Sequence, residues 1–224
     1  MSQTTASSTD RLRSDARRNY AQVLEAARQV ILERGPNAPL DEIARLAGVG
    51  IGTLYRRFGD RESLLKAVVL DALERSRAAA EEALAGHDEG YAGLAAYLRA
   101  ALDLRVAAVI PLVLDRLDLD DPELGPARDA SADAVQALID RAHDDGTLSR
   151  EVAFGDVGTL LVRLSRPLPG SMPAEMEAQL AHRHLDLFLA GLRVVDDAVL
   201  EGEGLSRAQL GRASRGDRAP DRPD

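Results

Sequence analysis

Four side chains able to donate hydrogen bonds to phosphates or base edges lie close together between residues 53 and 57. Hydroxyl and guanidinium groups are the side chains that contact nucleic-acid backbones and base edges most often. The glycines just before them let a backbone approach a partner closely. The pattern predicts a DNA-contacting surface made of Gly50, Ile51, Gly52, Thr53, Tyr55, Arg56 and Arg57.

The elements that position this surface are two short helices joined by a tight turn. Residues 40–47 and 51–58 have helical spacing, and Gly48 permits the turn between them. Leu54 and Phe58 are four residues apart and therefore face the core together. The inward residues of the first helix and turn are Ile43, Ala44, Ala47 and Val49. The spacing predicts a helix-turn-helix over about 39–58.

A long helix flanks this motif on each side. Apolar residues from Tyr20 to Ile31 repeat at helical spacing, which predicts a helix over 15–34 that ends at Gly35-Pro36. The charged residues Arg17, Arg18, Glu25 and Arg28 are expected to face away from that stripe. Asp60 is a predicted N-cap for a helix over 61–85.

The rest of the chain also has helical periodicity and no strand alternation, so the predicted fold is all-α. Helices are expected over about 91–104, 106–117, 127–143, 157–168 and 176–200, with Pro111 dividing or bending the second. The polar segments 1–12 and 203–224, rich in Arg, Gly, Ser, Asp and Pro, are predicted to be disordered tails.

Composition restricts the class of protein. The 224 residues are 45% hydrophobic and 29% charged, with no cysteine, which excludes disulfides and thiolate metal sites. No apolar run is long enough to span a membrane and the N-terminus lacks the order of a secretory signal, so we expect a cytoplasmic protein. The net charge of −9 is uneven: residues 1–66 carry +3 and the remainder −12, which suggests a polyanion-binding head on an acidic body.

The segment from Arg18 to Leu65 resembles the DNA-binding domain of TetR-type repressors. The recurring pattern of that family is matched at Ala26-Ala27, Gly35, Ile43-Ala44, Ala47-Gly48-Val49, Gly52-Thr53-Leu54-Tyr55, Phe58 and Arg61-Glu62-Ser63-Leu64. The resemblance implies a three-helix helix-turn-helix domain (13–60) joined by a long helix to a larger helical ligand-binding and dimerisation domain (61–202).

The resemblance also assigns roles to single residues. Thr53, Tyr55 and Arg57 would contact DNA, and Arg61 would bind phosphate where the family usually has a lysine. The chain departs from the family at Ala38-Pro39, which replaces the usual Thr caps and removes hydroxyls that bind phosphate.

For the body, the resemblance implies that the last two helices pair across a two-fold axis as a four-helix bundle. The apolar residues available for that interface are Leu160, Leu161, Leu164, Leu187, Phe188, Gly191 and Leu192; packing inside one chain is the alternative.

An effector pocket is expected among the middle helices, and its candidate residues are Tyr97, Arg105, Val109, Leu112 and Arg116. The scarcity of aromatic residues favours a small or aliphatic effector.

An enzyme or metal protein is not predicted, and no cofactor is expected. His182 and His184 are two residues apart and cannot share a helix face, while His143 at a helix C-terminus is a surface histidine. We therefore predict a homodimeric regulator, most simply a repressor, that binds double-stranded DNA and a small-molecule effector. The alternatives are a helical binding or adaptor protein with a degenerate helix-turn-helix, and an activator of the same fold.

Overall fold

The computed structural model describes residues 4–113, 116–118, 121–166, 168, 172–192 and 201–214, with the backbone alone described for 4–16, 106, 213 and 214. Helices are the only regular elements in these ranges, which confirms the all-α prediction. The chain forms two compact units, one of residues 1–72 and 109–125 and the other of residues 73–108 and 126–224.

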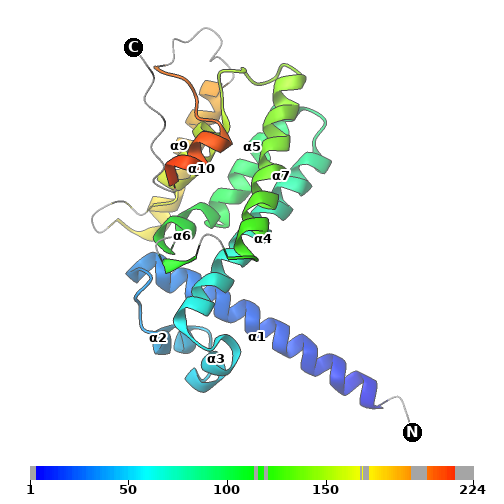
Figure 1. Ribbon diagram of the computed structural model, residues 1–224, viewed down its shortest axis with the longest axis vertical. Coiled ribbons are helices and arrows are strands. Elements are labelled where there is room, and N and C mark those ends of the chain that lie inside the picture. Colours follow the sequence, from blue (N-terminus) through cyan, green and yellow to red (C-terminus); the bar gives the residue numbers. More distant parts are fainter. Residues whose placement is uncertain are drawn as a thin grey trace. The chain divides into compact units, whose positions relative to one another are not determined.

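The first unit contains the predicted helix-turn-helix. Its helices are α1 (Thr4–Arg34), α2 (Leu40–Leu46), α3 (Ile51–Phe58) and the first part of α4 (Arg61–Gly86). In Figure 1, α1 is a long rod, and the short helices α2 and α3 lie beside it and against each other. The core of this unit is aliphatic and includes Leu24, Ala27, Ile31, Ile43, Leu54, Leu64, Leu65 and Val68.

Two glycines in left-handed backbone conformations set the ends of the short helices. Gly48 (φ +69°) follows α2, and the next amide, of Val49, donates to the carbonyl of Ala44. Gly59 (φ +81°) ends α3 and donates to the carbonyl of Tyr55 at 2.8 Å. A Cβ atom is unfavourable in this conformation, so glycine explains why α2 and α3 are short.

The predicted N-cap of α4 is confirmed. Asp60 Oδ1 accepts a hydrogen bond from the Ser63 amide at 2.8 Å, and this backbone N–H lowers the pKa of Asp60.

Arg28 corrects the expectation that the charged residues of α1 face away from the core. Arg28 is only 3% exposed, and its guanidinium donates to Asp71 of α4 at 2.6 Å and to Glu25 at 3.0 Å. Asp71 lies on a different helix, so spacing within α1 does not predict that this arginine is buried.

The second unit contains the remainder of α4 and the helices of the body. These are α5 (Gly90–Asp103), the start of α6 (Val106–Val113), most of α7 (Leu124–Asp144), α8 (Phe154–Leu164), α9 (Ala174–Leu192) and α10 (Arg207–Ser214). Its core contains Leu94, Leu98, Leu138, Ile139, Val157 and Leu185. Pro111 lies inside α6, and that helix ends two residues later, well before the predicted end at 117.

The start of α5 is held by the turn between α7 and α8. The amides of Gly90 and Tyr91 donate to Asp145 Oδ2 at 2.6 Å and to Thr147 Oγ1 at 3.0 Å. A Cβ atom on Gly90 would lie 2.4 Å from the backbone of Ala142, so α5 and α7 approach each other closely here.

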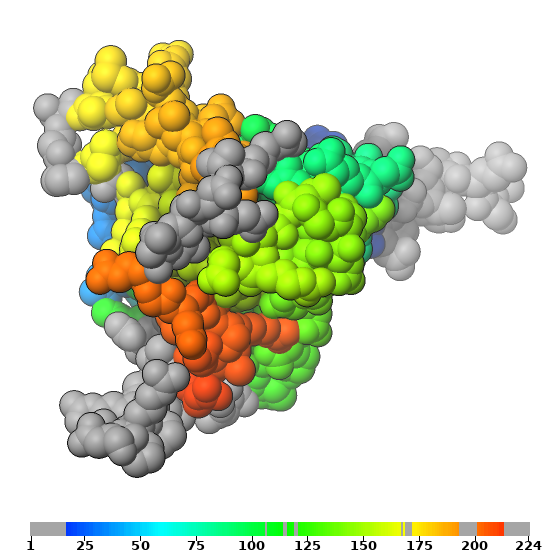
Figure 2. Space-filling model, turned by 90° about the horizontal axis from the view of Figure 1, so that it is seen from above, coloured from blue at the N-terminus to red at the C-terminus, as the bar shows by residue number. Residues whose placement is uncertain are grey.

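Both predicted tails contain helix. α1 begins at Thr4, because each residue added to a helix that is already packed gains a hydrogen bond. In the other tail, Ser206 and Gln209 form reciprocal bonds at the start of α10, and Arg207 pairs with Asp129 and Asp133 of α7. Figure 2 shows α10, in red, lying against green α7. Residues 1–3, 193–200 and 215–224 lie outside the described part of the chain.

Candidate DNA-binding surface

The surface predicted from residues 50–57 is one continuous exposed face of α3. The helix starts after Gly50, whose backbone is extended, and Leu54 holds it to the core with only 1% of its surface exposed. Because Leu54 takes the inner side, the residues around it turn outward, and Tyr55 is 50% exposed. The exposed residues are Gly50, Ile51, Gly52, Thr53, Tyr55, Arg56 and Arg57.

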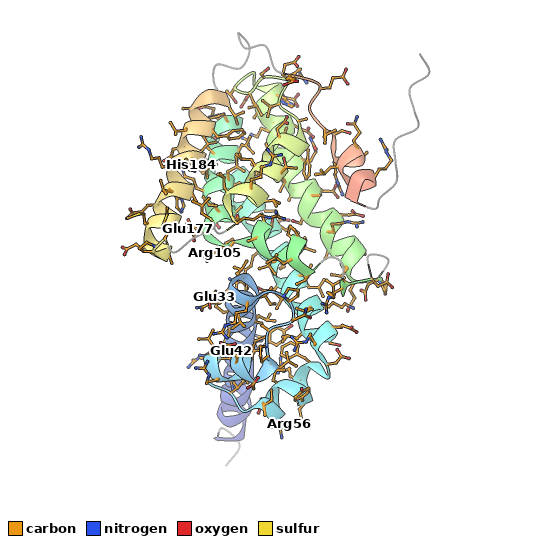
Figure 3. All side chains as sticks on the ribbon, turned by 90° about the vertical axis from the view of Figure 1, so that its left-hand side faces the viewer. Glu33, Glu42, Arg56, Arg105, Glu177 and His184 are labelled. Atoms are coloured by element: carbon orange, nitrogen blue, oxygen red, sulfur yellow. The ribbon has the colours of Figure 1, made fainter. Side chains whose placement is uncertain are left out.

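Two of these side chains are already arranged with respect to each other. Arg56 Nη2 donates to Thr53 Oγ1 at 3.2 Å, one helical turn away. Figure 3 shows Arg56 at the outer edge of α3, pointing away from the rest of the unit. Nothing lies within 4 Å of a Cβ atom built on Gly52, so the backbone is open to a partner at that point.

The end of α3 is held by an aromatic residue of α1. The rings of Tyr20 and Phe58 are stacked, with centroids 5.6 Å apart and planes 17° from parallel. The Cζ atom of Arg57 lies over the Tyr20 ring, 4.6 Å from its centroid. Phe58 is half-buried, as its spacing predicts, but the contact of Tyr20 with Arg57 was missed because no periodicity links residues so far apart in the chain.

Arg61 behaves differently from the other predicted contacts. Its Nη1 donates to the carbonyls of Ala38 at 2.5 Å and Pro36 at 3.2 Å, in the loop between α1 and α2. The side chain therefore stabilises a loop, whereas the resemblance assigns it to phosphate. That loop also contains Pro39, the N-cap of α2, which makes no side-chain cap bond.

The charges around α3 differ in how far they are neutralised. Glu42 pairs with Arg34 at 2.9 Å and lies 3.6 Å from Arg45, so it offsets both arginines. No carboxylate among the described residues pairs with Arg56 or Arg57. Arg56 and Arg57 therefore leave positive charge on the exposed face of α3 that is available to a polyanion.

The five residues predicted to bind a ligand are found in both units. In one unit, Tyr97 is buried and shares a hydrogen bond of 3.0 Å with Ser76, and burial raises the pKa of Tyr97. Arg105 of the same unit is exposed and has a φ of +50°. In the other unit, Val109 is fully buried and Leu112 and Arg116 are exposed. Their role in binding a ligand stays a prediction.

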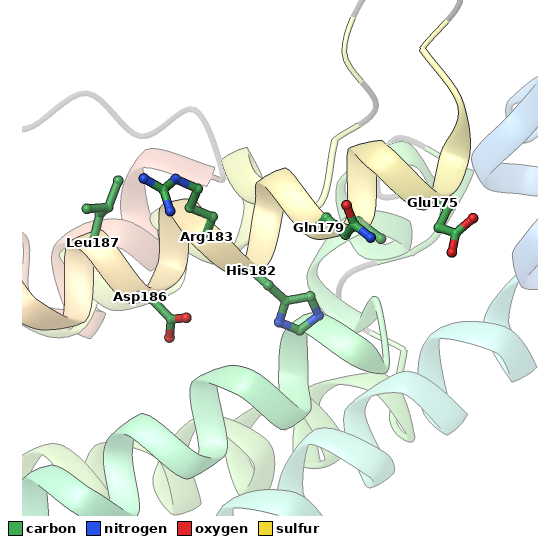
Figure 4. A pocket seen from close by; sticks show the side chains of 7 residues that line it. Glu175, Gln179, His182, Arg183, Asp186 and Leu187 are labelled. Atoms are coloured by element: carbon green, nitrogen blue, oxygen red, sulfur yellow. The ribbon is translucent and has the colours of Figure 1, made fainter.

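A hollow of about 600 Å³ on α9 involves none of those five residues. The described residues that line it all belong to α9: Glu175, Ala178, Gln179, His182, Arg183, Asp186 and Leu187. In Figure 4, His182 points toward α5, where its Nε2 lies 2.9 Å from Asp103 Oδ1, while Arg183 and Leu187 point to the opposite side. The hollow is therefore a surface feature of α9.

The residues predicted at a dimer interface differ in exposure. Leu161 and Leu192 are buried within the chain itself, so their side chains hold the helices of the body together. In contrast, Leu187 is 61% exposed and Gly191 has open space where a Cβ atom would be. Leu160, Leu164 and Phe188 are half-buried.

No metal site is found in the described ranges, where no three His, Asp or Glu side chains gather as a metal would require. His143 instead shares a hydrogen bond with the carbonyl of Val152 at 3.1 Å. No described helix is both long and apolar enough to cross a bilayer.

Comparison with known proteins matches both parts of the chain. A family model described as "Bacterial regulatory proteins, tetR family" matches residues 23–68, and one described as "Transcriptional regulator SbtR-like, C-terminal domain" matches residues 84–194. The HTH-type transcriptional repressor LfrR of Mycolicibacterium smegmatis is 30% identical over 131 residues, which cover 58% of this chain and 69% of that protein.

Solved structures give the same result. The TetR transcriptional regulator SCO0520 from Streptomyces coelicolor is 31% identical, with a TM-score of 0.56 over 77% of this chain and 97% of that one. LfrR from Mycobacterium smegmatis, solved in complex with proflavine, is 26% identical, with a TM-score of 0.57 over 77% and 96%.

Proposed function

Because this chain belongs to the TetR family of transcriptional regulators, with a helix-turn-helix DNA-binding domain, we propose that it is a homodimeric repressor that a small molecule releases from a palindromic operator. The observation that carries the proposal is the exposed face of α3. That face combines two arginines that lack a carboxylate partner in the described chain with hydroxyl groups and open backbone.

The proposed contacts follow from the chemistry of this face. Arg57 and Tyr55 are suited to phosphate oxygens, because both donate hydrogen bonds and both are exposed. Thr53 lies nearer the middle of α3, where a side chain in the major groove reaches base edges, and it contributes to sequence preference. The overall charge of the chain is −9, so binding depends on this local positive surface.

Dimerisation supplies the second half of the operator contact. Two heads bind successive major grooves only when they are about 34–36 Å apart, which a two-fold dimer achieves on a palindrome. We propose that the exposed side of α9 around Leu187 and Gly191, with the half-buried Leu160, Leu164 and Phe188, forms the interface. The open space at Gly191 allows a close approach of helices.

The proposed effector is a small molecule bound in the body. LfrR was solved with proflavine, and that precedent supports a ligand-binding body here; of the residues predicted to bind a ligand, Tyr97 and Arg105 belong to the body unit. An effector that favours the body conformation with lower operator affinity weakens operator binding. Operator DNA then weakens effector binding by the same factor. Binding to chromosomal DNA implies a cytoplasmic location.

Selection of duplexes from a random-sequence library by the purified protein tests the proposal. We expect an enriched inverted repeat with half-sites about one helical turn apart. Enrichment of no sequence over the starting library would contradict it and favour a helical binding protein that does not read DNA. Placed over a bacterial reporter promoter, the selected repeat should lower expression when the protein is present; raised expression would indicate an activator.

A further inference from the structure

Tyr20 lies outside the helix-turn-helix but contacts two successive residues of its second helix. Its ring stacks on Phe58 and lies under the guanidinium of Arg57, at the centroid distances of 5.6 Å and 4.6 Å given above. Tyr20 belongs to α1, whose buried residues form the core of the same unit. The ring therefore connects a rigid part of the unit to the last turn of α3.

The position of Arg57 makes this contact relevant to binding. An arginine has several rotatable bonds, and a free one loses conformational entropy when a partner immobilises it. No carboxylate among the described residues restrains Arg57. Its guanidinium is held instead by its contact with the Tyr20 ring. A guanidinium stacked on a ring keeps its N–H groups directed outward in its own plane, free to donate to phosphate.

We propose that Tyr20 is a positioning residue for DNA binding, which holds Arg57 in place for a phosphate through its aromatic ring. The inference rests on the proposed function, since it requires that Arg57 contact DNA. It assigns no DNA contact to Tyr20 itself. The hydroxyl of Tyr20 has no hydrogen-bond partner among the described side chains, so the ring alone carries the effect.

A double-mutant cycle on the full-length protein tests the proposal, with the duplex selected by the wild-type protein as the probe. Tyr20→Leu should weaken binding about 3- to 10-fold, while Tyr20→Phe, which keeps the ring, should bind like the wild type. In the Arg57→Ala background, Tyr20→Leu should cause no further loss, because the residue to be positioned is gone.

A purely structural role gives a different pattern. If Tyr20→Leu weakened binding equally with and without Arg57, or if it bound like the wild type, the proposal would be overturned. Equal losses for Tyr20→Phe and Tyr20→Leu would also overturn it, since the hydroxyl would then be responsible. Should Tyr20→Leu fail to fold by circular dichroism, Tyr20→Met takes its place in the cycle with the same expected loss. If the wild-type protein selects no duplex, the proposed function fails first, and that result is distinct from all of these.

Discussion

Lys66 Nζ lies 2.8 Å from Asp121 Oδ2 and joins α4 to the residues that precede α7, within the same unit. Lys66 also contacts Glu123 at 2.5 Å, and the other oxygen of Asp121 accepts from the amide of Leu124, so this carboxylate caps α7 as well. The bond to Asp121 is the main cause of the raised pKa of Lys66, and the bond to Lys66 is the main cause of the lowered pKa of Asp121.

We therefore predict that Lys66→Ala lowers the midpoint of thermal unfolding, because the segment before α7 loses its ionic contact with α4. Arg77→Ala is the matched control, since Arg77 pairs only with Glu74 and Glu81 of its own helix among the described residues. Pairs between exposed neighbours on one helix contribute little to stability. Equal midpoints for Lys66→Ala and Arg77→Ala in calorimetry would show that the contact with Asp121 does not stabilise the unit.

We expect that a methyl group added at Gly90 lowers the free energy of unfolding. Gly90→Ala places a methyl group 2.4 Å from the backbone of Ala142, so α5 or α7 must move. Overpacking of this kind typically costs about 1–3 kcal/mol in the free energy of unfolding. Gly125→Ala, where nothing lies within 4 Å, is the control and should be neutral or slightly stabilising. Urea denaturation measures both, and similar values for the two variants would contradict the close approach.

Asp145 gives a pH dependence with a defined sign. Its pKa lies below the ordinary value of 3.8, mainly because the Thr147 hydroxyl donates to it at 2.5 Å and also because the Gly90 amide does at 2.6 Å. A carboxyl whose pKa is lower in the folded state stabilises folding above its ordinary pKa, and that contribution is lost as pH falls through the lowered value.

The wild type should accordingly exceed Asp145→Asn in free energy of unfolding at pH 7, and the difference should shrink as the pH falls below about 4. Thr147→Val removes the largest cause and should reduce the pH-dependent part of the difference. Denaturation at one fixed protein concentration over a pH series checks this. A difference of the same size at pH 7 and pH 3 would disprove the assignment.

Leu187 tests the proposed dimer. Leu187→Glu puts a charge on the exposed side of α9 and should shift the protein from dimer to monomer in sedimentation. Leu46→Glu is the control: Leu46 is also exposed, but it lies on α2, outside the proposed interface. A dimer that persists in Leu187→Glu, or a monomeric wild type, would show that this face is not the interface.

Local signals in the sequence were enough to predict the recognition helix and its flanks. The bounds of α3 agree with the structure because Gly50 and Gly59 lie at its ends and Leu54 and Phe58 supply its inner side. The cap by Asp60 is likewise a contact between near neighbours. Patterns of this kind can be read from spacing because the interacting residues are within one or two helical turns.

Contacts between residues distant in the chain could not be predicted in this way. Arg28 is buried because Asp71 is available on α4, and Arg61 is turned inward by carbonyls of an earlier loop. The helix α10 was not predicted because its sequence is polar and contains glycine, whereas in the structure its Arg207 pairs with Asp133 of α7. In each case the residue type permits several roles, and a partner far along the chain determines which one is realised.

The salt dependence of operator binding tests the central claim most directly. Fluorescence anisotropy with the selected duplex should give a steep fall in affinity with salt, and Arg57→Ala should weaken binding and reduce the slope by about one. Arg150→Ala, at an exposed arginine of the body, should leave both affinity and slope unchanged. If the wild type and Arg57→Ala gave the same affinity and the same slope at every salt concentration, the exposed face of α3 would not be the DNA-binding surface.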